Sequence, residues 1–214
     1  MLAYLFWHRP LESSDPAAYE QAQVAFHRSL HRAPPVGLCG SSAFRVAGPP
    51  WLEPGGVDGR GYEDWYLVED YAALGVLNGA AVGRGHRTAH DAAARMLGAG
   101  AGGLYALVEG DRPQPGRSPG CESIGEATHA VWVARPPGSK SRLLGELLGD
   151  GMDRRHASLW RRQLVLGPAP EYCLLASEIP AGVAPTRLPP GVAPTRLPED
   201  WTATILDREL LWSG

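Results

Sequence analysis

Three side chains near apolar segments of this sequence are suited to acid–base chemistry at neutral pH. His8 and Arg9 follow the apolar run LAYLFW, and Arg45 lies in another apolar segment. A neutral imidazole can act as a general base near pH 7, and an arginine can stabilise the negative charge of an enolate. We therefore predict His8, Arg9 and Arg45 as candidate catalytic residues. The alternative for His8 is a structural histidine, hydrogen-bonded to a neighbour at the end of a strand.

Large aromatic side chains accompany these residues. The chain has seven tryptophans, and Trp65 and Tyr105 both fall in apolar segments. Such rings either line a hydrophobic pocket or fill a core. We predict that Trp65 and Tyr105 shape a substrate cavity and that Glu69 contributes a polar group to it. The alternative is that the tryptophans fill the core.

Two histidine pairs have the spacing of metal ligands on one helix face. His27 and His31 form one i,i+4 pair, and His86 and His90 form the other. Arginines lie between and beside them and would repel a cation, so we predict no metal site. Haem binding is an alternative. It would need an axial histidine, and His129 or His156 could supply one. No cofactor is predicted.

The overall composition excludes several classes of protein. The 214 residues carry a formal net charge of −3, with 20 basic against 23 acidic residues, so no basic field favours nucleic acid. Three scattered cysteines form neither a disulfide framework nor a zinc motif. No segment resembles a signal peptide or a membrane span. These features predict a cytoplasmic protein without a nucleic-acid or membrane partner; they do not predict its oligomeric state.

The first 110 residues alternate strand and helix patterns. A helix capped by Ser13, Ser14 or Asp15 is predicted to end at about Arg32. A long Ala/Leu-rich segment, 71–97, weakens at 83–85 and so predicts two helices, and the glycine run 98–103 predicts a helix-to-strand turn. The order is β-α-β-β-α-β, with strands at 2–8, 37–48, 62–69 and 103–109.

The second half of the chain repeats the first. A Pro/Gly/Ser-rich segment, 111–126, predicts a linker. Strand, Arg-Pro and helix patterns then recur in the same order over 127–214, with a helix at 141–152 and the eighth strand at 202–212. We predict two units, 1–110 and 127–214, joined by that linker.

The second unit departs from the first between its last two strands. There the eight residues GVAPTRLP occur twice, at 182–189 and 191–198. Prolines at this density exclude a regular helix, so the second unit lacks its second helix. We interpret the segment 181–198 as a duplicated surface loop, with a polyproline-type docking segment as the alternative.

A β-α-β-β-α-β unit is the ferredoxin-like arrangement, and two such units in one chain resemble the dimeric α+β barrel superfamily. That superfamily includes antibiotic-biosynthesis monooxygenases, muconolactone isomerases and, in tandem form, chlorite dismutases. The resemblance covers nearly the whole chain and is one of topology, without a diagnostic catalytic motif. It implies an α+β fold in which two tandem ferredoxin-like units form a pseudo-dimeric α/β barrel, with a small-molecule pocket inside the barrel or between sheet and helices.

The function predicted on this basis is a cofactor-independent oxygenase or isomerase that acts on a small hydrophobic molecule. A non-catalytic binding or assembly protein is the first alternative. A haem-binding relative of the chlorite dismutases is the second.

Overall fold

The computed structural model describes residues 1–47, 49–52, 60–83, 85–109, 121–134, 157–164, 170–177 and 201–214. Within them lie eight strands: β1 (Leu2–Pro10), β2 (Leu38–Ala47), β3 (Arg60–Val68), β4 (Leu97–Glu109), β5 (His129–Ala134), β6 (Ala157–Arg162), β7 (Tyr172–Ala176) and β8 (Thr202–Ser213). Four helices accompany them: α1 (Pro16–Arg32), α2 (Tyr71–Ala81), α3 (Arg87–Ala94) and α4 (Cys121–Glu126).

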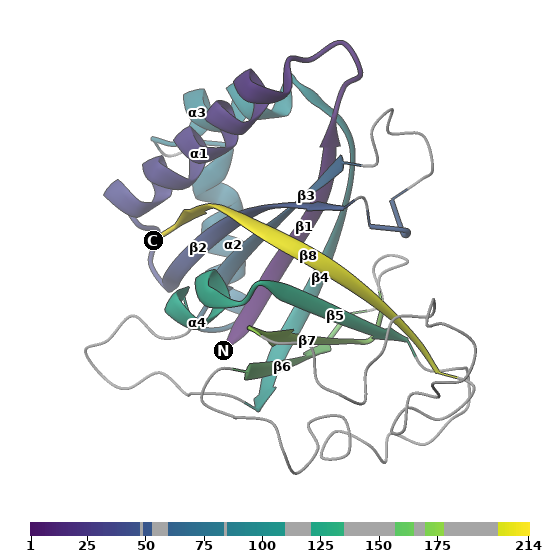
Figure 1. Ribbon diagram of the computed structural model, residues 1–214. Helices are drawn as coiled ribbons and strands as arrows, with labels where there is room; N and C mark the ends of the chain where they lie inside the picture. The colour runs from purple at the N-terminus through teal and green to yellow at the C-terminus, as the bar shows by residue number, and fades with distance from the viewer. Residues whose placement is uncertain are drawn as a thin grey trace.

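The eight strands close into one antiparallel barrel (Figure 1). Around the barrel their order is β1-β3-β2-β8-β5-β7-β6-β4. The strands of the first half are therefore ordered β4-β1-β3-β2 and those of the second half β8-β5-β7-β6. The two halves join where β2 pairs with β8 and where β4 pairs with β6.

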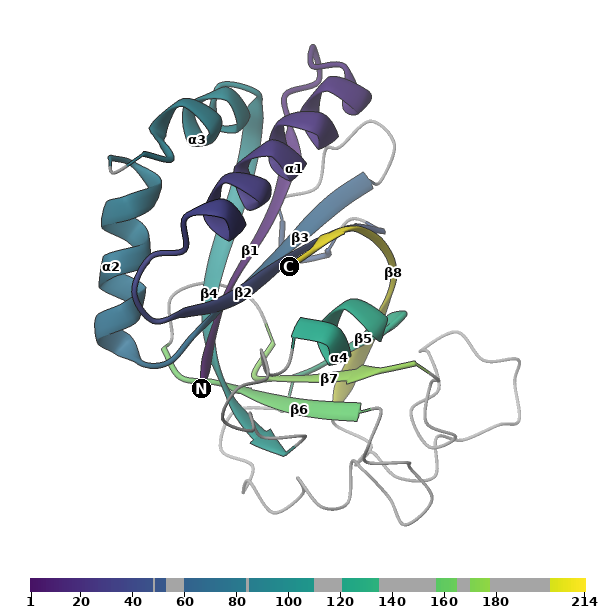
Figure 2. The same ribbon diagram turned by 90° about the vertical axis from the view of Figure 1, so that its left-hand side faces the viewer.

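Helices α1, α2 and α3 lie outside the barrel, against the strands of the first half (Figure 2). The helix starts follow from capping residues. Asp15 accepts a hydrogen bond from the Ala18 backbone N–H, and Asp70 accepts one from Ala73. Successive side chains of a strand point to opposite faces, and both faces of β1 are covered. Leu5 and Trp7 therefore pack into the barrel, and Tyr4 and Phe6 pack toward the helices.

Large side chains fill the barrel interior. Trp7, Trp65, Trp132 and Trp160 are all fully buried there, and their rings meet mostly edge to face. A buried ion pair lies among them: Glu63 accepts hydrogen bonds from the indoles of Trp7 and Trp65 and from Arg208 of β8. Core filling is thus how these four tryptophans are used.

Two predicted features differ in the structure. The glycine run 98–103 is part of β4 and not a turn, since β4 pairs with β1 from Leu97 onward. The end of the predicted linker contains α4, whose Ile124 packs into the barrel core. The predicted helix 141–152 and the duplicated segment 181–198 lie outside the described residues.

Candidate functional site

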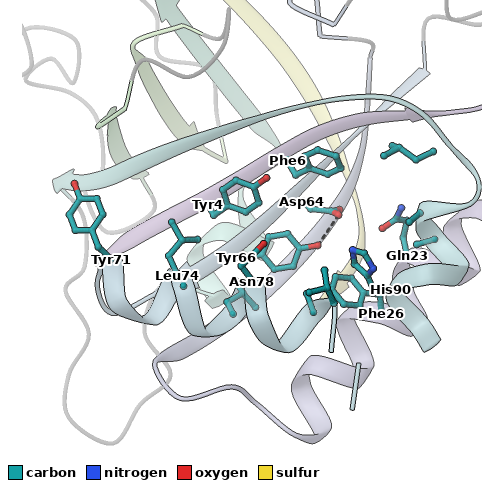
Figure 3. A pocket seen from close by; sticks show the side chains of 17 residues that line it. Tyr4, Phe6, Gln23, Phe26, Asp64, Tyr66, Tyr71, Leu74, Asn78 and His90 are labelled. Atoms are coloured by element: carbon teal, nitrogen blue, oxygen red, sulfur yellow. Dashed lines mark hydrogen bonds between the residues drawn. The ribbon is translucent and has the colours of Figure 1, made fainter. Parts of the chain in front are cut away.

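A cavity of about 600 Å³ lies between the helices and the outer face of the first-half sheet (Figure 3). Two of its lining residues, Tyr71 at the start of α2 and Val82 just after its end, are 56% and 51% exposed. Four polar side chains, besides tyrosines, line it: Gln23, Asp64, Asn78 and His90. The apolar and aromatic lining includes Tyr4, Phe6, Phe26, Tyr66, Leu74, Leu77 and Ala81.

Asp64 is the one lining carboxylate among the described residues, and it is 2% exposed. It projects from β3 toward the helices, because its neighbours Glu63 and Trp65 project into the barrel. The Tyr66 hydroxyl donates a hydrogen bond of 3.1 Å to Asp64 Oδ2, as Figure 3 shows. Asp64 thus presents a buried negative charge in an apolar wall.

Two buried histidines flank this carboxylate. His8 Nε2 lies 3.2 Å from Asp64 Oδ2, and His27 Nε2 lies 3.5 Å from Oδ1. Each ring is held at its other nitrogen by a hydroxyl: His8 Nδ1 is 2.7 Å from Tyr19 Oη, and His27 Nδ1 is 2.8 Å from Ser41 Oγ. With the hydroxyls donating to Nδ1, each Nε2 carries a proton directed at the carboxylate.

Asp64 keeps unused acceptor capacity. Its Oδ1 atom has no hydrogen-bond partner of good geometry among the described residues, and neither has His8 Nε2. Buried polar atoms are nearly always hydrogen-bonded, so an exception in a cavity wall calls for an explanation. Both atoms are themselves inaccessible to solvent, and His27 Nε2 lies beside Oδ1 at 3.5 Å.

The surroundings also set the charge of the site. Burial by itself raises the pKa of the Asp64 carboxyl, but the adjacent His8 and His27 lower it by a larger amount. The net effect is a lowered pKa. Burial and the Asp64 charge raise the pKa of the Tyr66 hydroxyl, which keeps it a donor. The site therefore holds an ionised carboxylate at neutral pH.

Because the folded protein depresses the pKa of Asp64, stability should depend on acid pH. The ionised carboxylate contributes stability above its unfolded pKa of about 3.9, and this contribution is lost as the pH falls below that value. We expect the urea midpoint of the wild type to fall more steeply below about pH 4 than that of Asp64→Asn. Parallel curves for the two proteins would contradict the assignment.

The other residues predicted to be catalytic lie away from the cavity. Arg9 is two residues from Trp7 and so shares its face of β1, opposite to that of His8. Arg45 donates two hydrogen bonds of 2.8 Å to Glu20 of α1 and also pairs with Glu209 of β8. Since these acceptors neutralise its charge, Arg45 is not free to face a ligand in the cavity.

The residues predicted to bind substrate also lie elsewhere. Trp65 and Tyr105 are buried inside the barrel, where the Tyr105 hydroxyl donates to the Pro170 carbonyl. Glu69 is exposed at the end of β3 and is not a lining residue. The cavity is shaped instead by Tyr4, Phe6 and Tyr66 on the other face of the same sheet.

The histidine pairs do not converge on a common point. His27 contacts Asp64, His31 packs against Trp212, and His86 contacts Ser29, while His90 lines the cavity and pairs with Asp91. Among the described residues no group of three or more His, Cys, Asp or Glu side chains could hold a metal ion. His129 pairs with the exposed Asp207, and His156 lies outside the described residues.

Asp64 is not among the site residues predicted from the sequence, although one signal was available. The segment YEDWYLVE places two adjacent carboxylates inside an otherwise apolar strand. Each must find partners when that strand is buried. Since neighbouring strand residues face opposite sides, the pair implies one polar site in the barrel and another beneath the helices.

Solved structures share this architecture at very low sequence identity. One is a provisionally named monooxygenase from Fusobacterium nucleatum, with a TM-score of 0.51 and 9% identity over 83% of this chain and 76% of that one. Another is an anthrone oxidase-like protein, with a TM-score of 0.50 and 11% identity over 100% of this chain and 92% of that one. Both belong to the dimeric α+β barrel superfamily.

This chain has the α+β barrel fold of those proteins. The predicted barrel is thereby confirmed, while identities this low show nothing about the reaction. The sequence matches no family profile and no curated protein. None of the described helices has the length and hydropathy needed to cross a bilayer.

Proposed function

We propose that this protein binds a hydrophobic, ring-containing small molecule in the cavity and that Asp64 takes a proton from it, in a reaction of the oxygenase or isomerase type. The observation that carries the proposal is the buried Asp64 carboxylate in the wall of an apolar cavity, where Oδ1 makes no hydrogen bond of good geometry among the described residues and has His27 Nε2 beside it at 3.5 Å. Asp64 is ionised at neutral pH, the form in which a carboxylate can accept a proton.

The cavity suits such a ligand in size and lining. Its volume of about 600 Å³ is in the range of small-molecule sites, which combine apolar walls with a few polar groups. Gln23, Asn78 and His90 come from three different helices and line the same cavity as Asp64 (Figure 3). In the proposal these side chains donate hydrogen bonds to a ligand oxygen, the task first assigned to Arg45 or Arg9.

The proposed reaction starts at a C–H bond next to a carbonyl group. The Asp64 carboxylate takes the proton, and the electron pair of the broken bond delocalises onto the carbonyl oxygen as an enolate. Returning the proton to another carbon completes an isomerisation. Alternatively the enolate reduces dioxygen: anthrone plus O₂ would give anthraquinone plus water, with carbon oxidised and oxygen reduced.

In this proposal His8 and His27 act through Asp64. They hold the carboxylate in place through their Nε2–H groups, so His8 is a positioning residue and not the base that contacts the ligand. The names of the two similar structures, a monooxygenase and an anthrone oxidase-like protein, support the oxygenase version.

We also propose that the two halves are tandem ferredoxin-like units. The orders β4-β1-β3-β2 and β8-β5-β7-β6 correspond strand for strand, and this correspondence supports a duplication. Helices α1, α2 and α3 accompany the first half, so the proposed site belongs to that half alone.

The binding step can be tested with two tryptophan substitutions in α2. Leu74 lines the cavity, whereas Val76 on the same helix does not and is 38% exposed. With anthrone as the probe, we expect Leu74→Trp to fill the cavity and weaken binding at least about tenfold, and Val76→Trp to bind as the wild type does. Titration calorimetry under nitrogen measures both.

The outcomes separate the alternatives. If the wild type binds anthrone and consumes neither it nor dioxygen, a non-catalytic binding protein is favoured. If Leu74→Trp binds as tightly as the wild type, the cavity is not the binding site and the proposal fails.

A further inference from the structure

The glycine run of β4 passes beside the aromatic wall of the cavity. Gly102 pairs with Phe6, and Gly100 pairs with His8. The Phe6 ring leans across onto Gly100, where an added Cβ would lie 2.4 Å from Cζ of the ring. The Tyr4 ring leans onto Gly102, where an added Cβ would lie 2.7 Å from the hydroxyl oxygen. Both rings thus occupy space that any larger residue on β4 would need.

Backbone conformation does not explain these glycines. The described glycines with positive φ are Gly37, Gly40 and Gly85, so Gly100 and Gly102 have backbones that other residues adopt freely. A glycine inside a strand then marks the close approach of another group. Here that group is an aromatic ring lying across the sheet.

We propose that Gly100 and Gly102 set the size of the molecule that the cavity admits. This inference rests on the proposed function, since Phe6 and Tyr4 both line the cavity. A methyl group at position 100 would displace the Phe6 ring from β4. The sheet lies beneath the ring and His8 stacks beside it at 5.1 Å, so the open direction is into the cavity.

The inference is tested by measuring the affinities for phenol, 1-naphthol and anthrone, which have one, two and three rings, by calorimetry under nitrogen. We expect Gly100→Ala to weaken anthrone binding at least about tenfold and phenol binding by no more than about twofold. Gly102→Ala should act in the same direction. Gly100→Ala combined with Phe6→Ala should restore anthrone binding, because the displaced ring is gone.

Gly79→Ala is the matched control. Gly79 lies on α2 with nothing within 4 Å of an added Cβ, so its variant should bind all three probes as the wild type does. Equal loss of all three probes in Gly100→Ala, or an unchanged order of affinities, would overturn the inference and leave the proposed function standing. If the wild type binds none of the probes, the proposed function itself fails, and this inference with it.

Loss of folding would be seen as a lower melting temperature. Should Gly100→Ala not fold, Gly102→Ala gives the same test at the second ring, and Phe6→Ala alone should tighten binding of the three-ring probe relative to phenol. Unchanged selectivity in both would also overturn the inference.

Discussion

Replacing Asp64 with asparagine is expected to slow proton abstraction by a factor of about 10² to 10⁴, the usual contribution of a general base. The amide has nearly the same shape and can still accept the hydrogen bond from Tyr66, but it cannot take a proton. Ligand affinity should therefore change much less than the rate. This difference separates a catalytic carboxylate from one that only shapes the cavity.

The measurement is deuterium incorporation at the methylene group of anthrone in D₂O under nitrogen, followed by dioxygen uptake in air. Tyr105→Phe is the control, because Tyr105 lies inside the barrel and should leave both rates unchanged. His8→Gln should give an intermediate loss and a displaced pH profile, as expected of a positioning residue. A full rate in Asp64→Asn would refute the role of Asp64.

Replacing Arg208 with methionine should cause the largest loss of stability, about 3–5 kcal/mol. Arg208 and Glu63 are both inaccessible to solvent at their side chains, and their Nε and Oε1 atoms are 3.2 Å apart. Arg208 also donates to the carbonyls of Ile124 and Ala127, which ties β8 to the segment of α4. Methionine fills similar volume but leaves Glu63 charged, buried and without its cation.

Urea denaturation at neutral pH measures the loss, and for a chain of this length it corresponds to a fall in melting temperature of roughly 6–20 °C. The double variant Glu63→Gln with Arg208→Met removes both charges and should recover part of the stability. Arg45→Met breaks the partly exposed pair with Glu20 and should cost at most about 1 kcal/mol. A loss below that value for Arg208→Met would contradict the role of the buried pair.

Most strand and helix positions could be predicted because they depend on local pattern. Asp15 and Pro16 start α1, and alternating or continuous apolar runs give the strands. The two halves repeat this pattern, and two such units in one chain resemble the dimeric α+β barrel superfamily. The barrel could be predicted from that resemblance. The run 98–103 was mispredicted as a turn because glycine inside a segment weakens a strand pattern. The reason for these glycines is that the Phe6 and Tyr4 rings lie over Gly100 and Gly102, and the local sequence does not show those contacts.

The candidate site could be predicted only in part. His8 was identified from its place at the end of an apolar strand, yet its partners Tyr19 and Asp64 are 11 and 56 residues away along the chain. Nothing in the local sequence links them. Only pairing of β1 with β3 and packing of α1 over both bring these groups together.

The sequence by itself determined most of the strands and helices, the abundance of aromatic side chains and the absence of a strong charge bias. These properties follow from residue type and periodicity. The tertiary structure alone decided which face each residue serves: of two adjacent carboxylates, Glu63 joins the barrel core and Asp64 the cavity. The physical reason is that closing the sheet gives each strand an inside and an outside, and a shift of one residue exchanges them.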